Sequence, residues 1–219
     1  MYQLAIFDLD GTLLDTIEDL SNACNYALKS FGYETHDVAA YKYFVGSGIY
    51  KLVERALPEG AKDEATVLKV KAVFDEYYGA HSEDYTKPYE GIQEALTILN
   101  AKGIQCAVLT NKAQVYATEL IKRQFKDQIA FVMGQREGVP TKPNPIGIYD
   151  LIKKFDVQKE ACIYMGDSDI DMLTAKNAGV TSIGVLWGFR TKEELLNAGA
   201  HHLAEKPEEL VKLILDNPK

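Results

Sequence analysis

The amino-acid sequence predicts an α/β protein, a doubly wound parallel sheet with a helical subdomain inserted after its first strand. Short apolar runs alternate with segments of helical periodicity along most of the chain, as is typical of parallel strands joined by crossover helices. The alternation is interrupted once, between residues 15 and 87, where helical patterning continues without a convincing strand. We therefore expect a core of residues 1–14 and 88–219 and a helical insert of residues 15–87.

The strands of the core are expected where short apolar runs end at polar loops. The first run, Leu4–Phe7, stops at Asp8, as a buried parallel strand does where it emerges at its carboxyl end. The later strands share this pattern and are expected at Gln105–Thr110, Ile129–Met133, Ala161–Met165 and Thr181–Val185. Such a sheet is covered by helices on both faces.

The insert is expected to be helical throughout. Its first helix should cover 15–31, because apolar side chains recur there on one face, with Asp15 or Thr16 as the N-cap and Gly32 as the stop. Its other helices are expected at 37–43, 49–57 and 63–78. The chain should return to the core at Pro88, which restricts the backbone ahead of a new helix.

Charge and composition exclude several classes of protein. The net charge of −8 argues against nucleic-acid binding, which needs a basic face to displace counterions. There is no run of about 18 apolar residues, and the N-terminal run stops at Asp8, so neither a membrane span nor a secretion signal is expected. Cys24, Cys106 and Cys162 are an odd, widely spaced set in apolar surroundings, which indicates reduced thiols in the cytoplasm.

Polar residues follow each predicted strand and should meet at one edge of the sheet, since the site of a doubly wound fold lies at the carboxyl ends of its strands. They are Asp8 and Asp10, Thr110-Asn111-Lys112, Thr141-Lys142-Pro143, and Gly166-Asp167-Ser168-Asp169-Ile170-Asp171. Several carboxylates cannot sit together without a counter-charge, and an all-oxygen set suits Mg²⁺. Lysine, hydroxyl and backbone N–H groups suit a phosphoryl group.

With these motifs in order, the chain resembles the haloacid-dehalogenase-like superfamily of phosphotransferases, with a Rossmann-like core. The helical insert looks like the smaller cap of this family. The stretch at 184–190, followed by Glu193-Glu194-Leu195 and Ala198-Gly199-Ala200, resembles the phosphoglycolate-phosphatase type in particular. The resemblance covers residues 4 to about 215.

The resemblance implies a role for each site residue. Asp8 would be the nucleophile that forms an aspartyl-phosphate, and Asp10 the acid–base, with Gly11 allowing the tight turn between strand and loop. Mg²⁺ would be held by the carboxylates of Asp8 and Asp167 and the backbone carbonyl of Asp10. The phosphoryl group would be bound by Thr110, Lys142 and the backbone N–H of Asn111, with Leu9 in the same binding set. Asp171 would orient Lys142 or a metal-bound water.

The activity expected is Mg²⁺-dependent hydrolysis of a small phosphorylated metabolite, with 2-phosphoglycolate the best single candidate, by a monomer or homodimer. A sugar-phosphate mutase or a pyrophosphatase could use the same core. A haloacid dehalogenase would have no use for an acid at position 10 or for magnesium. A signalling receiver domain would be shorter, without the insert, and a binding module without activity would not need the complete set. The loop Gly46-Ser47-Gly48 is either a connector or a segment that contacts the substrate.

Overall fold

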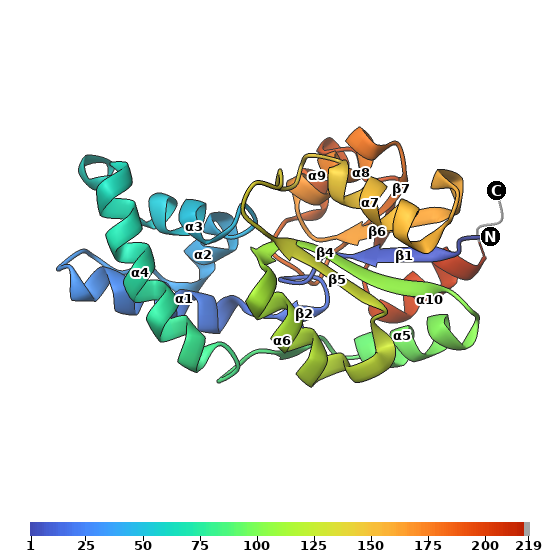
Figure 1. Cartoon of the computed structure of the whole chain (residues 1–219), viewed down its shortest axis with the longest axis horizontal. Coiled ribbons are helices and arrows are strands. Elements are labelled where there is room, and N and C mark those ends of the chain that lie inside the picture. The colour runs from blue at the N-terminus through green and yellow to red at the C-terminus, as the bar shows by residue number, and fades with distance from the viewer. Residues whose placement is uncertain (217–219) are drawn as a thin grey trace.

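The computed structural model describes residues 1–216 and contains a six-stranded parallel sheet in the order β5-β4-β1-β6-β7-β8 (Figure 1). Its strands are β1 (Leu4–Phe7), β4 (Gln105–Ala113), β5 (Phe131–Gln135), β6 (Cys162–Gly166), β7 (Thr181–Val185) and β8 (His202–Ala204). The first strand of the chain lies in the middle, between β4 and β6. The predicted fold class is confirmed. The end of the predicted core, residues 217–219, lies outside the described residues.

Helices cover both faces of the sheet (Figure 1). One face carries α5 (Ile92–Ala101), α6 (Gln114–Phe125) and α10 (Pro207–Leu215), and the other carries α7 (Ile146–Phe155) and α8 (Asp169–Ala178), with α9 (Lys192–Asn197) beside α8. Within residues 1–216 there are also three 3₁₀ turns: η1 (Glu59–Ala61), η2 (Lys126–Gln128) and η3 (Lys159–Ala161).

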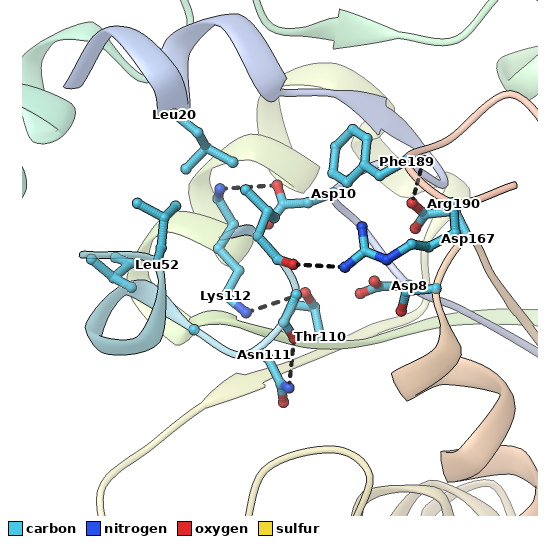
Figure 2. Close-up of a pocket in the computed structure, with 15 residues that line it drawn as sticks. Asp8, Asp10, Leu20, Leu52, Thr110, Asn111, Lys112, Asp167, Phe189 and Arg190 are labelled. Atoms are coloured by element: carbon cyan, nitrogen blue, oxygen red, sulfur yellow. Dashed lines mark hydrogen bonds and ion pairs between the residues drawn. The ribbon is translucent and has the colours of Figure 1, made fainter. Parts of the chain in front are cut away.

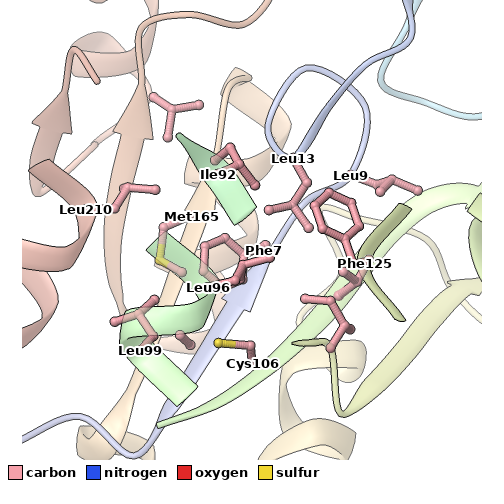
Figure 3. Close-up of a cluster of buried hydrophobic side chains, with 14 of the residues drawn as sticks. Phe7, Leu9, Leu13, Ile92, Leu96, Leu99, Cys106, Phe125, Met165 and Leu210 are labelled. Carbon is pink, nitrogen blue, oxygen red and sulfur yellow. The ribbon is translucent and has the colours of Figure 1, made fainter. Parts of the chain in front are cut away.

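The alternation of side chains along β1 explains why the sheet is covered twice. Ala5 and Phe7 belong to a large apolar cluster with α5, α6 and α10, in which Figure 3 shows Phe7 beside Leu96. Leu4 and Ile6 point to the opposite face and join a second cluster with α7 and α8. All of β1 is buried, so the residues at its carboxyl end rest on a rigid support.

A helical cap stands at one end of the core (Figure 1). It is made of α1 (Ile17–Ser30), α2 (Val38–Phe44), α3 (Ile49–Ala56) and α4 (Glu64–His81). The cap has its own apolar cluster, in which Tyr41, Phe74 and Tyr78 are fully buried. All four predicted helices are present within a few residues of their predicted bounds. The domain boundaries at 15 and 87 stay a prediction.

Short pairings were missed at the sequence level. Leu14–Asp15 (β2) and Lys87–Pro88 (β3) form a two-stranded antiparallel ribbon where the chain enters and leaves the cap, although no strand was expected between residues 15 and 87. The edge strand β8 was also not expected. These strands have two or three residues each, too few to show a period of two. Among the described helices, none has the length and apolar character needed to cross a membrane.

Candidate active site

Asp8 is the first residue after β1, and its backbone N–H still donates to the Met165 carbonyl at 2.8 Å. The chain then turns sharply, with the N–H of Gly11 donating to the Leu14 carbonyl at 2.9 Å. Gly11 has a φ of +83°, and a Cβ there would lie 2.4 Å from Asp167 Oδ2. Both facts require glycine. The turn thus brings the first motif directly against Asp167.

Three carboxylates meet at this edge of the sheet. Asp8, Asp167 and Asp171 are buried, and one oxygen of each lies within 4.8 Å of the others. Burial, and then the charge of Asp171, raise the pKa of Asp8 to about 7, although Lys142 acts in the opposite direction. Burial and the charges of Asp171 and Asp8 also raise the pKa of Asp167 well above its ordinary value. The cluster therefore carries more negative charge than its surroundings balance.

Asp171 has no oxygen lone pair left for a metal. Its Oδ1 accepts from Lys142 Nζ at 2.7 Å and from the Tyr164 hydroxyl at 2.9 Å. Its Oδ2 accepts from the Ser168 backbone at 3.0 Å and the Ser168 hydroxyl at 2.6 Å. A carboxylate offers about four acceptor positions, and here donors of the protein occupy them all. Asp171 therefore stands behind the site and supports Lys142.

Asp8 and Asp167, in contrast, keep free acceptor positions. Asp167 accepts one bond on each oxygen, from the Thr12 hydroxyl at 3.1 Å and the Phe189 backbone at 2.8 Å. Asp8 Oδ1 lies 2.8 Å from Lys142 Nζ and forms an ion pair with it, but the contact does not have the geometry of a hydrogen bond. This oxygen is buried and has no hydrogen-bond donor. Two partly satisfied carboxylates at this distance fit a hard divalent cation.

Lys142 sits between two of the carboxylates and is held there from both sides of its backbone. The Asn111 side chain accepts from the Lys142 N–H at 2.9 Å and donates to the Lys142 carbonyl at 3.1 Å. Burial lowers the pKa of Lys142, but the charges of Asp171 and Asp8 outweigh it and raise that pKa above its ordinary value. The ammonium is therefore charged. The Asn111 side chain, on β4, thus holds the loop that carries Lys142 against the end of this strand.

Thr110, Asn111 and Lys112 lie where the pairing of β4 with β5 shifts register, between Leu109 and Ala113. Such an irregularity redirects side chains at a strand end. Thr110 and Asn111 line the same pocket as Asp8. The Leu9 side chain instead packs in the apolar core, so a contact of Leu9 with a ligand could involve only its backbone.

Lys112 is a site residue whose role the sequence did not show. Its ammonium donates to Asp10 Oδ1 at 3.0 Å and to the Tyr78 hydroxyl of α4 at 2.7 Å. Burial lowers the pKa of Lys112, but Asp10 and Tyr78 raise it above its ordinary value overall. Asp10 is thereby tied to the cap. The only signal in the sequence was that Lys112 directly follows Thr110 and Asn111. A lysine at such a position is usually exposed to solvent.

The cap lines one side of the pocket over these residues, with Leu20 and Leu52 on that side (Figure 2). Gly46 and Gly48 of the loop between α2 and α3 line it, and the Gly46 carbonyl accepts from the Asn111 side chain at 2.9 Å. Ser47 does not line the pocket, because its hydroxyl accepts from Arg55 within the cap. The cavity measures about 30 Å³, room for about two waters. The glycine loop is therefore part of the site.

Known proteins are similar to this chain in sequence and in fold. The family model of haloacid dehalogenase-like hydrolases matches residues 5–185. A phosphoglycolate phosphatase of Vibrio parahaemolyticus is 30% identical over 218 residues, covering 97% of this chain and 96% of the relative. One of Neisseria meningitidis is 33% identical over 191 residues, covering 85% and 81%. The crystal structure of a candidate phosphoglycolate phosphatase of Lactobacillus delbrueckii has a TM-score of 0.94 and 33% identity, covering 99% of both chains.

The chain therefore belongs to the haloacid dehalogenase-like hydrolase family, as one of its phosphatases. Within that family it is similar to phosphoglycolate phosphatases over nearly its whole length. The resemblance drawn from the four sequence motifs is confirmed.

Proposed function

We propose that the protein is a Mg²⁺-dependent phosphatase of a small phosphorylated metabolite, with 2-phosphoglycolate as the leading candidate, working through an aspartyl-phosphate on Asp8. The observation that carries the proposal is the buried set of Asp8, Asp167 and Lys142 beside the pocket between cap and core. The names of the relatives support the substrate.

The chemistry would run in two displacements at phosphorus. Asp8 forms a bond to phosphorus as the bond to the leaving oxygen breaks, and Asp10 gives its proton to that oxygen. Asp10 then takes a proton from water, whose oxygen attacks phosphorus and releases phosphate from Asp8. Lys142, 2.8 Å from Asp8 Oδ1, favours the ionised nucleophile. Lys112 would keep the Asp10 side chain at the mouth of the pocket.

The phosphoryl oxygens would be bound by Thr110, by Lys142 and by backbone N–H groups of the first and second motifs, those of Leu9 and Asn111. Mg²⁺, when bound by the carboxylates of Asp8 and Asp167 and the Asp10 carbonyl, supplies positive charge that offsets the carboxylates and the phosphoryl group. Asp171 supports Lys142 from behind.

The pocket lies between the cap and the core, so the leaving group would lie against Leu20, Ile49 and Leu52 of the cap. We further propose a cytoplasmic enzyme, since Cys24, Cys106 and Cys162 are buried free thiols.

The test is phosphate release from a panel of phosphomonoesters and pyrophosphate, with Mg²⁺ or with EDTA. We expect 2-phosphoglycolate to be turned over fastest, only with Mg²⁺, and Asp8→Asn to lose at least about 10³-fold in kcat. Asp127→Asn, the same change at an exposed position, is the matched control. Release that survives EDTA or Asp8→Asn would refute the mechanism. A preference for pyrophosphate would refute the substrate class.

A further inference from the structure

We infer that Arg190 binds a carboxylate on the leaving group of the substrate, and so selects phosphorylated hydroxy acids over neutral phosphomonoesters. This rests on the proposed phosphatase function and adds to it the residue that sets specificity. Arg190 lies in the loop after β7 and lines the pocket with Asp8 and Asp167 (Figure 2).

The position of Arg190 is fixed by its neighbour in the chain. The backbone N–H of Phe189 donates to Asp167 Oδ2 at 2.8 Å, so the loop is attached to the reaction centre one residue before Arg190. The Arg190 side chain is only 8% exposed. The anchored backbone therefore fixes where the Arg190 side chain begins, and contacts with the Lys42 and Val45 carbonyls hold its guanidinium.

The carboxylates around the pocket do little to balance the positive charge of Arg190. Lys112 lies 3.0 Å from Asp10, and Lys142 lies 2.8 Å and 2.7 Å from Asp8 and Asp171. Arg190 has a single ion pair among the described residues, a long one of 3.6 Å from its Nε to Asp169, whose side chain is half exposed. Such a pair contributes little.

The remaining partners of Arg190 do not neutralise it. Its Nη1 donates to the Lys42 carbonyl, its Nη2 lies 3.5 Å from the Val45 carbonyl, and its guanidinium carbon lies 5.0 Å from the centroid of the Tyr43 ring. None of these partners carries a charge. Its charge also helps to lower the pKa of Glu194, after the hydrogen bonds from Thr191 that occupy this carboxylate. A buried guanidinium gains most from a carboxylate held at short range.

The other residues of the pocket wall indicate what kind of molecule carries the carboxylate that Arg190 would bind. Away from the reaction centre, the wall is apolar. It consists of Leu20, Val45, Ile49, Leu52 and Phe189, together with Gly46 and Gly48. The hydroxyl groups of a sugar would lose their water there without replacement. A short leaving group that ends in a carboxylate would place its one charge on Arg190, whose planar fork matches two carboxylate oxygens.

The test compares two esters of similar size, 2-phosphoglycolate and 2-hydroxyethyl phosphate, on wild type, Arg190→Met and Arg190→Lys. Wild type should prefer 2-phosphoglycolate in kcat/KM. Arg190→Met should lose about 10- to 100-fold on 2-phosphoglycolate, mainly through KM, and no more than about 3-fold on 2-hydroxyethyl phosphate. Arg190→Lys should recover part of the loss, because it keeps the charge without the fork.

Equal losses on both esters would overturn the inference, because they would mean that Arg190 only holds the cap loop through Lys42 and Val45. The wild-type preference is a test that needs no variant: hydrolysis of both esters without preference for the acid refutes the role of Arg190 and leaves the phosphatase proposal standing. Absence of hydrolysis of either ester and of the rest of the panel refutes the phosphatase proposal itself. Asp169→Asn is the control and should keep the preference for the acid.

Discussion

The pKa of Asp8 shows how strongly its surroundings act on a single side chain. Burial and the Asp171 carboxylate raise this pKa to about 7. A carboxyl group in the unfolded chain titrates near about 4. Between these values the folded protein holds a proton that the unfolded chain has lost, so the free energy of unfolding falls as the pH rises through this window. Asp167 shifts in the same direction.

Metal binding should therefore depend on pH. A divalent cation binds the ionised carboxylate, and below about pH 7 it must displace the proton on Asp8. At a fixed Mg²⁺ concentration, we expect the unfolding temperature to rise more at pH 8 than at pH 5.5, relative to EDTA. Thermal unfolding at the two pH values measures this. The Asp8→Asn protein should show a smaller Mg²⁺ shift, and equal shifts of the wild type at both pH values would contradict the account.

At the residue scale, the sequence predicted the groups that follow strands, and the structure brings Asp8, Asp167 and Asp171 together as expected. The sequence could not show which side chains form hydrogen bonds with these groups. Tyr164 lies inside β6 and looks like a core residue, yet its hydroxyl contacts Asp171. Lys112 and Arg190 depend on cap residues, distant in sequence, that contact them only in the folded protein.

The hydrogen bonds that stabilise the start of helix α8 also hold Asp171 of the candidate site. It begins with a capping box, in which the Ser168 hydroxyl accepts from the Asp171 N–H at 3.3 Å, and the Asp171 carboxylate accepts from the Ser168 N–H and hydroxyl. Its capping residue therefore orients the carboxylate that supports Lys142. The same hydrogen bonds that begin the helix hold part of the site.

Ser168→Ala should therefore affect both stability and activity. Loss of the cap should cost about 1 kcal/mol in the free energy of unfolding. Release of Asp171 should lower kcat by about 10-fold. Denaturant unfolding and steady-state kinetics measure the two effects.

The matched control is Asp63→Ala, which removes the N-cap hydrogen bond to Thr66 at the start of α4. It should lower stability and leave kcat unchanged. An unchanged kcat in Ser168→Ala as well would show that Asp171 needs no support from the cap.

Among the elements, the long buried strands and the amphipathic helices were predictable, because their periods extend over enough residues. β5 begins at Phe131 rather than Ile129, and β4 continues to Ala113 through a shift of register. The start of β5 and the end of β4 depend on which residues of the two strands pair with each other. The ribbon of β2 and β3 exists only because two segments more than 70 residues apart meet, which no local pattern encodes.

The whole molecule consists of a cap and a core whose apolar clusters are largely separate. Phe189 is the buried core residue that belongs to the cap cluster. The pocket lies between the cap and the core, and the chain crosses between the two parts at β2 and β3. The polar contacts beside this ribbon should therefore govern how firmly the cap is attached.

Asp19 makes the main contact of this kind. It is 2% exposed in the first turn of α1, and its carboxylate accepts from Tyr85 N–H at 3.1 Å, Thr86 N–H at 2.8 Å and Thr86 hydroxyl at 2.7 Å. It thus ties the start of the cap to the segment that returns to the core. Asp19→Ala would leave these donors unsatisfied, at a cost of about 3 kcal/mol in the free energy of unfolding.

Glu18→Ala removes a carboxylate from the same turn, but an exposed one, and should change stability little. Hydrogen exchange separates attachment from general loss of stability. In Asp19→Ala, the amides of residues 85 and 86 should exchange faster by a larger factor than those of β1, because the effect is local. A uniform increase in exchange across cap and core would instead show that the two parts open as one unit, and that Asp19 is only one contact among many.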